Sequence, residues 1–265
     1  MKLMLVAASA DYSTADVSRG IGRALEQVAE VRHYSLNTRM ALAVAGLKAL
    51  KPPDADEDAS ADMDQVCELA CEAIPYRVAT TGCRWALFIS GIGVHPNALV
   101  ALRRMGVRIA GWFTEAPYHT DDEKELYLAQ FCDVAFVNER TSVGDFQTVI
   151  DRHQPGGAAV YLPHAYDPEQ HRPLGEGDPP PTDDERSDVV FVATGFAERQ
   201  RTLEMVSFDG IDFRLGGLWT GLHAPSHLAA YRRHDCMRNA DVVRLYHGTK
   251  IALNIHRFAD GAESA

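Results

Sequence analysis

Short apolar runs alternate with helical patterns along most of the chain. The apolar runs predict strands at 2–9, 31–36, 84–90, 108–114, 133–138 and 158–163, and the intervening patterns predict helices near 16–29, 62–74, 96–105, 121–131 and 142–152. Thr14 is expected to cap the first helix, and Pro96 suits the first turn of the helix at 96–105. Strands that alternate with helices are typical of a parallel sheet with helical crossovers. Residues 1–166 therefore predict a doubly wound α/β domain.

The composition changes at 167–187, where the chain holds five prolines and seven acidic residues and shows no apolar periodicity. Such a segment is typical of a linker between domains. The alternating pattern then restarts, with strands at 188–193, 212–215 and 250–255 and helices near 198–206, 226–233 and 239–248. Because a small domain with few strands has a thin core, we expect 188–265 to be a partial second domain of the same class.

The composition is that of a globular protein. Hydrophobic residues make up 46% and charged residues 24% of the 265 positions, which is enough to form a core. The formal net charge of −11 argues against a surface that binds nucleic acid by neutralising phosphates. Five cysteines without a C-x-x-C pair suggest neither a disulfide framework nor a zinc ribbon, so we expect a cytoplasmic protein. No apolar run has the length of a secretion signal or a membrane span.

Polar and small residues follow the predicted strands of the first domain. Since the carboxyl ends of parallel strands lie at one edge of a sheet, these residues are expected to line a ligand site. Small residues after strand 84–90 would let a ligand approach backbone N–H groups, although a tight turn explains them equally well. Glu115 could instead cap the following helix. The candidates are Ser90, Gly91, Gly93, Thr114, Glu115, His119, Asn138, Glu139, Arg140 and His164.

In the second domain, Gly195, Glu198 and Arg199 open a predicted helix, and Gly216 follows a predicted strand. Backbone amides at these positions could hold a diphosphate, with Arg199 or Lys250 supplying positive charge. Lys250 could also be a simple surface charge. Neither glycine set matches G-x-G-x-x-G, so a dinucleotide site is poorly supported.

Patterns for metal sites and hydrolases are weak. The acidic stretch 54–64 holds D-x-D spacings but follows no strand, so it is most simply a solvated loop. His223 and His227 have a ligand-like spacing, but Pro225 between them argues against a helical metal site. No G-x-S-x-G elbow or Walker loop occurs, and we assign no metal ligands.

Five segments carry a family resemblance: GWFTEAPYH (111–119), DVAFVNERTS (133–142), YLPHAYDP (161–168), DVVFVATGFAERQ (188–200) and LYHGTKIALNIHR (245–257). They are similar to segments of the glycosyltransferases that resemble the spore maturation protein CgeB. The family implies the GT-B architecture, in which two Rossmann-like, doubly wound parallel-sheet domains face a cleft. The resemblance places the acceptor on the N-terminal side and a nucleotide-diphosphate sugar mainly on the C-terminal side, with no metal or other cofactor.

The resemblance also implies roles for individual residues. Glu263 would contact the donor sugar, Lys250 and Arg199 the diphosphate, and His119, Glu115 and His164 would face the acceptor. If the enzyme inverts the configuration at the anomeric carbon of the sugar, His119 is the preferred base, because the side chain of histidine titrates near physiological pH. If it retains the configuration, the leaving phosphate could take the proton. The implied donor-binding residues are Gly195, Glu198, Arg199, Gly216, Lys250, Asn254, His256 and Arg257.

The end of the sequence departs from the family pattern. Family members continue into G-E-S-x-N-x-R-x-F-E, of which Gly261, Glu263 and Ser264 match only the beginning. We therefore expect a C-terminally truncated form with an incomplete second domain and doubtful transfer activity.

Three functions remain open. The first is a glycosyltransferase acting on a polysaccharide, protein, small-molecule or modified-DNA hydroxyl. The second is a non-catalytic nucleotide-sugar binder that works with a second copy or a partner chain through the unfinished sheet edge at 250–255. The third is an unrelated two-lobed small-molecule binder.

Overall fold

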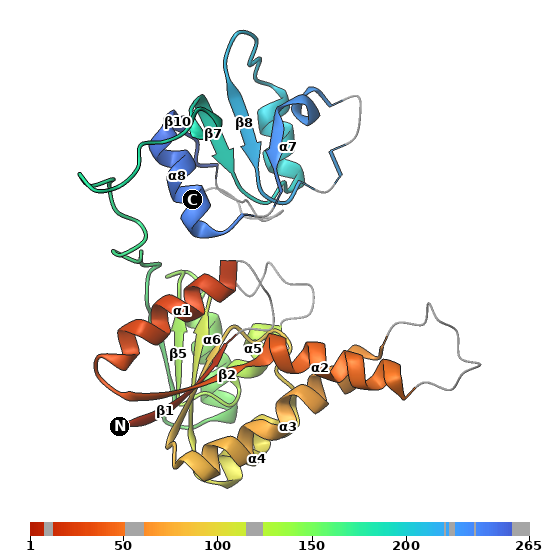
Figure 1. Ribbon diagram of the computed structural model, residues 1–265. Coiled ribbons are helices and arrows are strands. Elements are labelled where there is room, and N and C mark those ends of the chain that lie inside the picture. The colour runs from red at the N-terminus through yellow and green to blue at the C-terminus, as the bar shows by residue number, and fades with distance from the viewer. Residues whose placement is uncertain are drawn as a thin grey trace. The chain divides into compact units, whose positions relative to one another are not determined.

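The computed structural model divides the chain into two compact units, Met1–Ala165 and Tyr166–Ala265 (Figure 1). It describes residues 1–7, 13–50, 61–114, 124–219, 221–222, 226–235 and 237–255. The proposed partition into a domain at 1–166, a linker at 167–187 and a domain at 188–265 stays a prediction.

The first unit holds a six-stranded, fully parallel sheet in the order β2-β1-β3-β4-β5-β6. The order confirms the doubly wound α/β prediction, because the chain runs outward from β1 in both directions. The strands are β1 (Lys2–Ala7), β2 (Glu30–Ser35), β3 (Trp85–Ile89), β4 (Arg108–Phe113), β5 (Val134–Val137) and β6 (Ala158–Tyr161). The helices are α1 (Ser13–Glu26), α2 (Leu36–Ala49), α3 (Met63–Thr81), α4 (Pro96–Arg104), α5 (Lys124–Ala129) and α6 (Val143–His153).

Both faces of the central strands are covered, which explains their continuous apolar sequences. On one face, Met4 and Val6 of β1 pack in a cluster with residues of α3, α4, α5 and α6. On the other face, Leu3 and Leu5 pack with Ile21 of α1. The carboxyl ends of the strands are thereby fixed by cores on both sides of the sheet.

Two helices differ from the sequence prediction. Helix α2 was not predicted, because its apolar and small residues show little helical periodicity; it begins where Ser35 accepts a hydrogen bond from the N–H of Thr38. Helix α3 continues to Thr81 through Pro75, where the prediction stopped at residue 74. Helix α4 begins with Pro96 in its first turn, as predicted. Helix α1 begins at Ser13, so Thr14 lies inside the helix and the prediction that it caps α1 is wrong.

The second unit holds a four-stranded parallel sheet in the order β10-β7-β8-β9. Its strands are β7 (Ser187–Val192), β8 (Phe213–Gly216), β9 (Arg232–His234) and β10 (Thr249–Ala252), and its helices are α7 (Ala197–Glu204) and α8 (Asn239–Gly248), with short 3-10 turns at Asp183–Glu185 and His227–Tyr231. The predicted helix at 226–233 is wrong. Ser226 caps only the 3-10 turn, after which the chain extends beside β8 as β9.

Aromatic side chains fill the core of the second unit. Phe208 stacks on Phe213 with ring centroids 3.8 Å apart, and Trp219, only 1% exposed, lies edge-on to Phe191. Leu203 of α7 joins the same cluster. Helix α8 lies against β7 and β10. The unit therefore has a layered core of its own.

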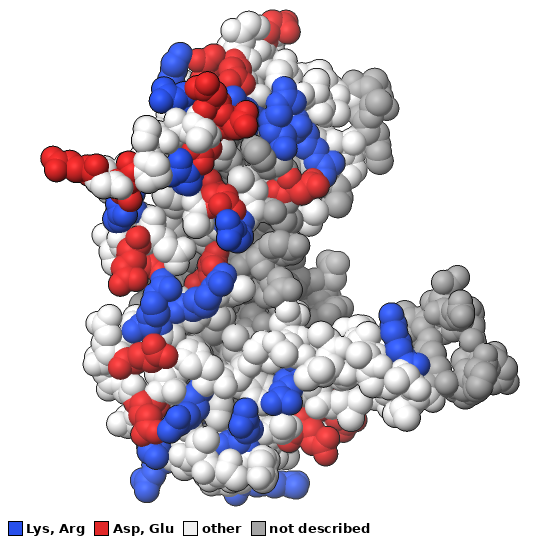
Figure 2. Space-filling view, viewed as in Figure 1, with Lys and Arg blue, Asp and Glu red and all other residues white. Residues whose placement is uncertain are grey.

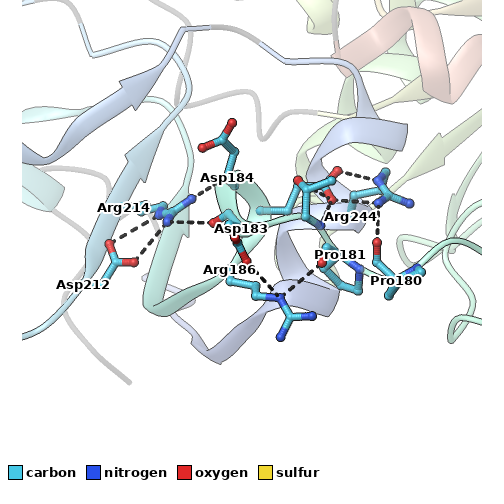
Figure 3. A network of polar contacts seen from close by, with 10 residues as sticks. Pro180, Pro181, Asp183, Asp184, Arg186, Asp212, Arg214 and Arg244 are labelled. Carbon is cyan, nitrogen blue, oxygen red and sulfur yellow. Dashed lines mark hydrogen bonds and ion pairs between the residues drawn. The ribbon is translucent and has the colours of Figure 1, made fainter.

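Part of the segment predicted as a linker is bonded to α8 (Figure 3). Arg244 of α8 donates hydrogen bonds to both carboxylate oxygens of Glu185 and to the carbonyl oxygen of Pro180. His247 is bonded to the carbonyl oxygen of Arg172 through Nε2, 2.9 Å away. The 3-10 turn at Asp183–Glu185 is additionally bonded by Arg214, which contacts the carbonyl oxygens of Asp183 and Asp184. These bonds fix the proline-rich segment to the second unit.

The Arg244–Glu185 pair predicts an acid-sensitive attachment. Hydrogen bonds from Arg244 lower the pKa of Glu185 from 4.5 to about 2. Because the pKa is lowered on folding, the pair stabilises the fold fully above pH 4.5 and loses this effect as the pH falls toward 2. We expect urea unfolding to show a stability gap between the parent and Glu185→Gln that is largest at neutral pH and narrows below pH 4.5. Glu204→Gln, on an exposed residue of α7, is the control. A gap that stays constant with pH would contradict the assignment.

Candidate functional site

The carboxyl edge of the first sheet begins with a tight turn after β3. Ser90 is buried and has a φ of +62°, a conformation uncommon outside glycine and found often at functional sites. Its N–H donates to the carbonyl oxygen of Trp112, and its Oγ accepts from the N–H of Ile92. Gly91 accepts from the N–H of Val94. The structure thus contains the tight turn, and ligand binding by Ser90, Gly91 and Gly93 stays a prediction.

Helix α3 holds this turn through Cys71. The Cys71 thiol donates to the carbonyl oxygen of Gly93, and Sγ accepts from the N–H of His95, 3.3 Å away. Burial raises the pKa of Cys71 to about 11, so the thiol stays protonated at neutral pH. This role of Cys71 was not identified from the sequence, because its contact partners lie 22 and 24 positions away.

Three strand ends meet at Asn138, which follows β5. Its Nδ2 donates to the carbonyl oxygen of Thr114 after β4, 3.0 Å away, and lies 2.8 Å from Nε2 of His164 after β6. Because Nδ2 is a donor, this contact uses Nε2 of His164 as its acceptor. Asn138 Oδ1 is buried and has no hydrogen-bond partner. Such an atom costs free energy and often marks a place where a ligand or water binds.

The other predicted residues of this edge are distributed as follows. Arg140 stacks over the ring of Tyr161, at the end of β6, with Cζ 4.7 Å from the ring centroid. Glu139 is half-buried beside Asn138 in the sequence. Glu115 and His119 lie outside the described residues, and so do Glu263, His256 and Arg257.

The glycines of the second unit have a packing role. A Cβ on Gly195 would lie 2.3 Å from a ring atom of Trp219, and a Cβ on Gly217 would lie 2.2 Å from the carbonyl oxygen of Ala193. The indole N–H of Trp219 donates to the carbonyl oxygen of Gly216. These glycines let the turns after β7 and β8 pack directly against each other. The sequence indicated only that small residues were present, not which partner required them.

The cationic candidates of the second unit lie at two different edges of the sheet. Arg199 donates through Nε to the carbonyl oxygen of Ile255 and through Nη1 to that of Thr194, both at the carboxyl edge. Lys250 lies at the amino end of β10, where Nζ is 2.6 Å from Asp188 Oδ1. This hydrogen bond raises the pKa of Lys250 and lowers that of Asp188. The structure therefore does not bring Lys250 close to Gly216, which lies at the opposite edge of the sheet. Asn254 is exposed and follows β10 at the carboxyl edge, on the same side as Gly216.

Glu198 lies in the first turn of α7, directly after the turn that contains Gly195. Its Oε1 is buried and, like Asn138 Oδ1, has no hydrogen-bond partner. Both sheets thus have an unpaired buried acceptor among the residues that follow their strands. This feature depends on three-dimensional contacts that the sequence pattern did not reveal.

Charged side chains of both signs lie on the surface. Figure 2 shows Lys and Arg interspersed with Asp and Glu over the face in view, without one continuous basic area. Among the described residues, no group of three or more His, Cys, Asp or Glu is placed to hold a metal ion. None of the described helices is long and apolar enough to cross a membrane.

Comparison with known proteins identifies the fold. Neither a protein-family model nor a curated protein sequence matches the chain. Solved structures do. A sucrose-phosphate synthase from Thermosynechococcus elongatus matches with a TM-score of 0.61 and 11% identity, over 95% of this chain and 74% of its own. A putative UDP-N-acetylglucosamine 2-epimerase from Listeria monocytogenes matches with a TM-score of 0.59 and 12% identity, over 95% of this chain and 73% of its own.

A third match is a UDP-GlcNAc 2-epimerase from Neisseria meningitidis bound to UDP-GlcNAc. Its TM-score is 0.57 at 12% identity, and the match covers 95% of this chain and 77% of the epimerase. At such low identity the likeness shows the fold alone. The chain consists of two α/β units with parallel sheets of six and four strands, and it has the GT-B fold.

Proposed function

We propose that this protein transfers a sugar from a nucleotide-diphosphate donor to an acceptor hydroxyl, as a relative of the CgeB-like glycosyltransferases. The observation that supports the proposal most is the GT-B fold itself, which extends over 95% of the chain and is similar to an epimerase solved with UDP-GlcNAc. The five segments that resemble the CgeB-like family favour transfer over epimerisation.

The donor is proposed to bind at the carboxyl edge of the second sheet. Ligands of parallel sheets bind at this edge, and it carries Gly195, Gly216, Glu198 and Asn254. Arg199 lies there as well, in contact with two backbone carbonyl oxygens. Glu263, His256 and Arg257 are assigned to the donor through the family resemblance alone. Lys250 is not included, because it lies at the amino edge.

The acceptor is proposed to bind at the carboxyl edge of the first sheet. Asn138 and His164 offer a buried acceptor oxygen and an imidazole there, a pair that suits recognition of hydroxyl groups. If the reaction inverts the configuration at the anomeric carbon, His119, or Glu115 in the same T-E-A-P-Y-H segment, takes the acceptor proton; if it retains the configuration, the leaving diphosphate takes it. The proposal includes no metal or other cofactor.

Calorimetric titration with UDP, GDP, ADP and dTDP, alone and as sugar conjugates, tests donor binding. We expect saturable binding of UDP and one UDP-sugar, since UDP compounds are bound in similar structures. Sugar release or transfer from that conjugate would then support catalysis, and Glu263→Ala should abolish it. Binding without turnover would favour a non-catalytic nucleotide-sugar binder. No binding by the folded protein would contradict the proposal.

A further inference from the structure

A buried carboxylate oxygen without a partner is the least expected polar atom of the second unit. The structure has three buried, unpaired side-chain polar atoms in the part of the chain that it describes: Ser18 Oγ, Asn138 Oδ1 and Glu198 Oε1. Only Glu198 is an acidic residue. An unpaired acceptor closed to water costs free energy, and the cost is larger for a charged group. A residue that keeps such an atom invites a functional explanation.

The location of Glu198 restricts what could pair with it. It is the second residue of α7, whose start has no side-chain cap, and it follows the turn of Gly195 at the carboxyl edge of β7. A carboxylate in the first turn interacts favourably with the helix dipole, and it already supplies the negative charge that this end attracts. A diphosphate at the same place would bring two like charges together. A neutral hydrogen-bond donor could bind next to the Glu198 carboxylate without this repulsion.

We propose that Glu198 Oε1 accepts a hydrogen bond from a hydroxyl group of the nucleotide sugar, and that the diphosphate binds elsewhere than the start of α7. This inference rests on the proposed function. Hydroxyl groups of this ligand belong either to the ribose or to the transferred sugar, and both offer the same chemistry. Because Oε1 is closed to water in the structure, the proposed hydrogen bond requires a neighbouring group to move aside.

The proposal predicts opposite effects on stability and on affinity. Replacing Glu198 by methionine removes an unpaired buried acceptor while keeping the length of the side chain, so the unliganded protein becomes more stable. The lost interaction with the helix dipole reduces this gain. The same change removes the hydrogen bond to the ligand. A residue with only a structural role would not lower affinity while raising stability.

The test compares Glu198→Met with Glu204→Met, a control at the exposed end of the same helix. Thermal unfolding without ligand and calorimetric titration with UDP and UDP-GlcNAc are measured on both and on the parent. We expect Glu198→Met to unfold a few degrees higher and to bind about 10–100-fold more weakly, the range for a hydrogen bond to a charged group. Glu204→Met should match the parent in both.

The two ligands distinguish the source of the hydroxyl. An equal loss with UDP and UDP-GlcNAc assigns the ribose, and a loss confined to UDP-GlcNAc assigns the sugar. Unchanged affinity overturns the inference, and tighter binding would mean that the diphosphate lies at α7. If the parent binds neither ligand, the proposed function fails first and the inference fails with it. Glu198→Gln, which keeps an acceptor oxygen, replaces the methionine variant if that variant does not fold, with a smaller loss of affinity expected.

Discussion

Gly217→Ala is expected to unfold the second unit, whereas Gly210→Ala leaves it folded. Gly217 has a φ of +102°, and its added methyl group would lie 2.2 Å from the backbone oxygen of Ala193. The backbone cannot move aside as a flexible side chain does. We therefore expect the free energy of unfolding to fall by more than about 4 kcal/mol, a loss that only the most disruptive substitutions cause. Gly210 has a similar left-handed φ of +74° but open space around it, so only the conformational cost of about 1–2 kcal/mol applies.

Urea unfolding followed by tryptophan fluorescence measures the difference. Trp219 reports on the second unit when Trp85 and Trp112 of the first unit are replaced by phenylalanine in all variants. Both glycine variants carry the same chemical change, so the comparison isolates the close approach of the turns after β7 and β8. Equal losses for Gly217→Ala and Gly210→Ala would show that the two turns do not pack as described.

The second large effect concerns Trp219 and Gly195, which we expect to be strongly coupled. Trp219→Ala removes the largest fully buried side chain and should cost about 3–5 kcal/mol. Gly195→Ala places a methyl group 2.3 Å from the indole and should cost about 1–3 kcal/mol through overpacking. Gly195 has no left-handed φ, so the backbone itself accepts alanine.

A double-mutant cycle separates these terms. In the Trp219→Ala background the new methyl group at position 195 enters space that the indole has left, so Gly195→Ala should become nearly neutral. The two single losses would then exceed the loss of the double variant by about 1–3 kcal/mol. Strictly additive losses, measured by urea unfolding followed by far-ultraviolet circular dichroism, would mean that Gly195 is not required for the packing of Trp219.

Most strands could be predicted from the sequence because buried parallel strands are short apolar runs bounded by polar residues. The prediction failed where tertiary contacts decide the structure. Residues 36–49 form α2 without a clear helical period, and their only fully buried side chain is Leu36. Residues 232–234 become β9 because β8 offers an edge for pairing, which the sequence of that segment does not indicate.

The candidate site was predictable only in outline. Topology alone brings the residues after β4, β5 and β6 to one edge, so Thr114, Asn138 and His164 could be expected near each other. The hydrogen bonds between them could not be predicted, because these depend on the orientation of the side chains. Gly195 was interpreted as a point of ligand approach, while its contact with Trp219 is a packing requirement that a sequence cannot show.

The strand order also has a consequence for how each unit folds during synthesis. In the first unit, β4, β5 and β6 each pair with the strand that precedes them in the chain, whereas β3 pairs with β1 instead of β2. In the second unit, β7 pairs with β10, and the bonded pair Ser187 and Thr249 is 62 residues apart. At about 5–20 residues per second, a ribosome needs roughly 3–12 s to make that span. Throughout this interval one side of β7 lacks its partner. The first unit passes through the same kind of stage, because β1 has to wait for β3, whose Trp85 pairs with Leu3 across an even longer stretch of chain.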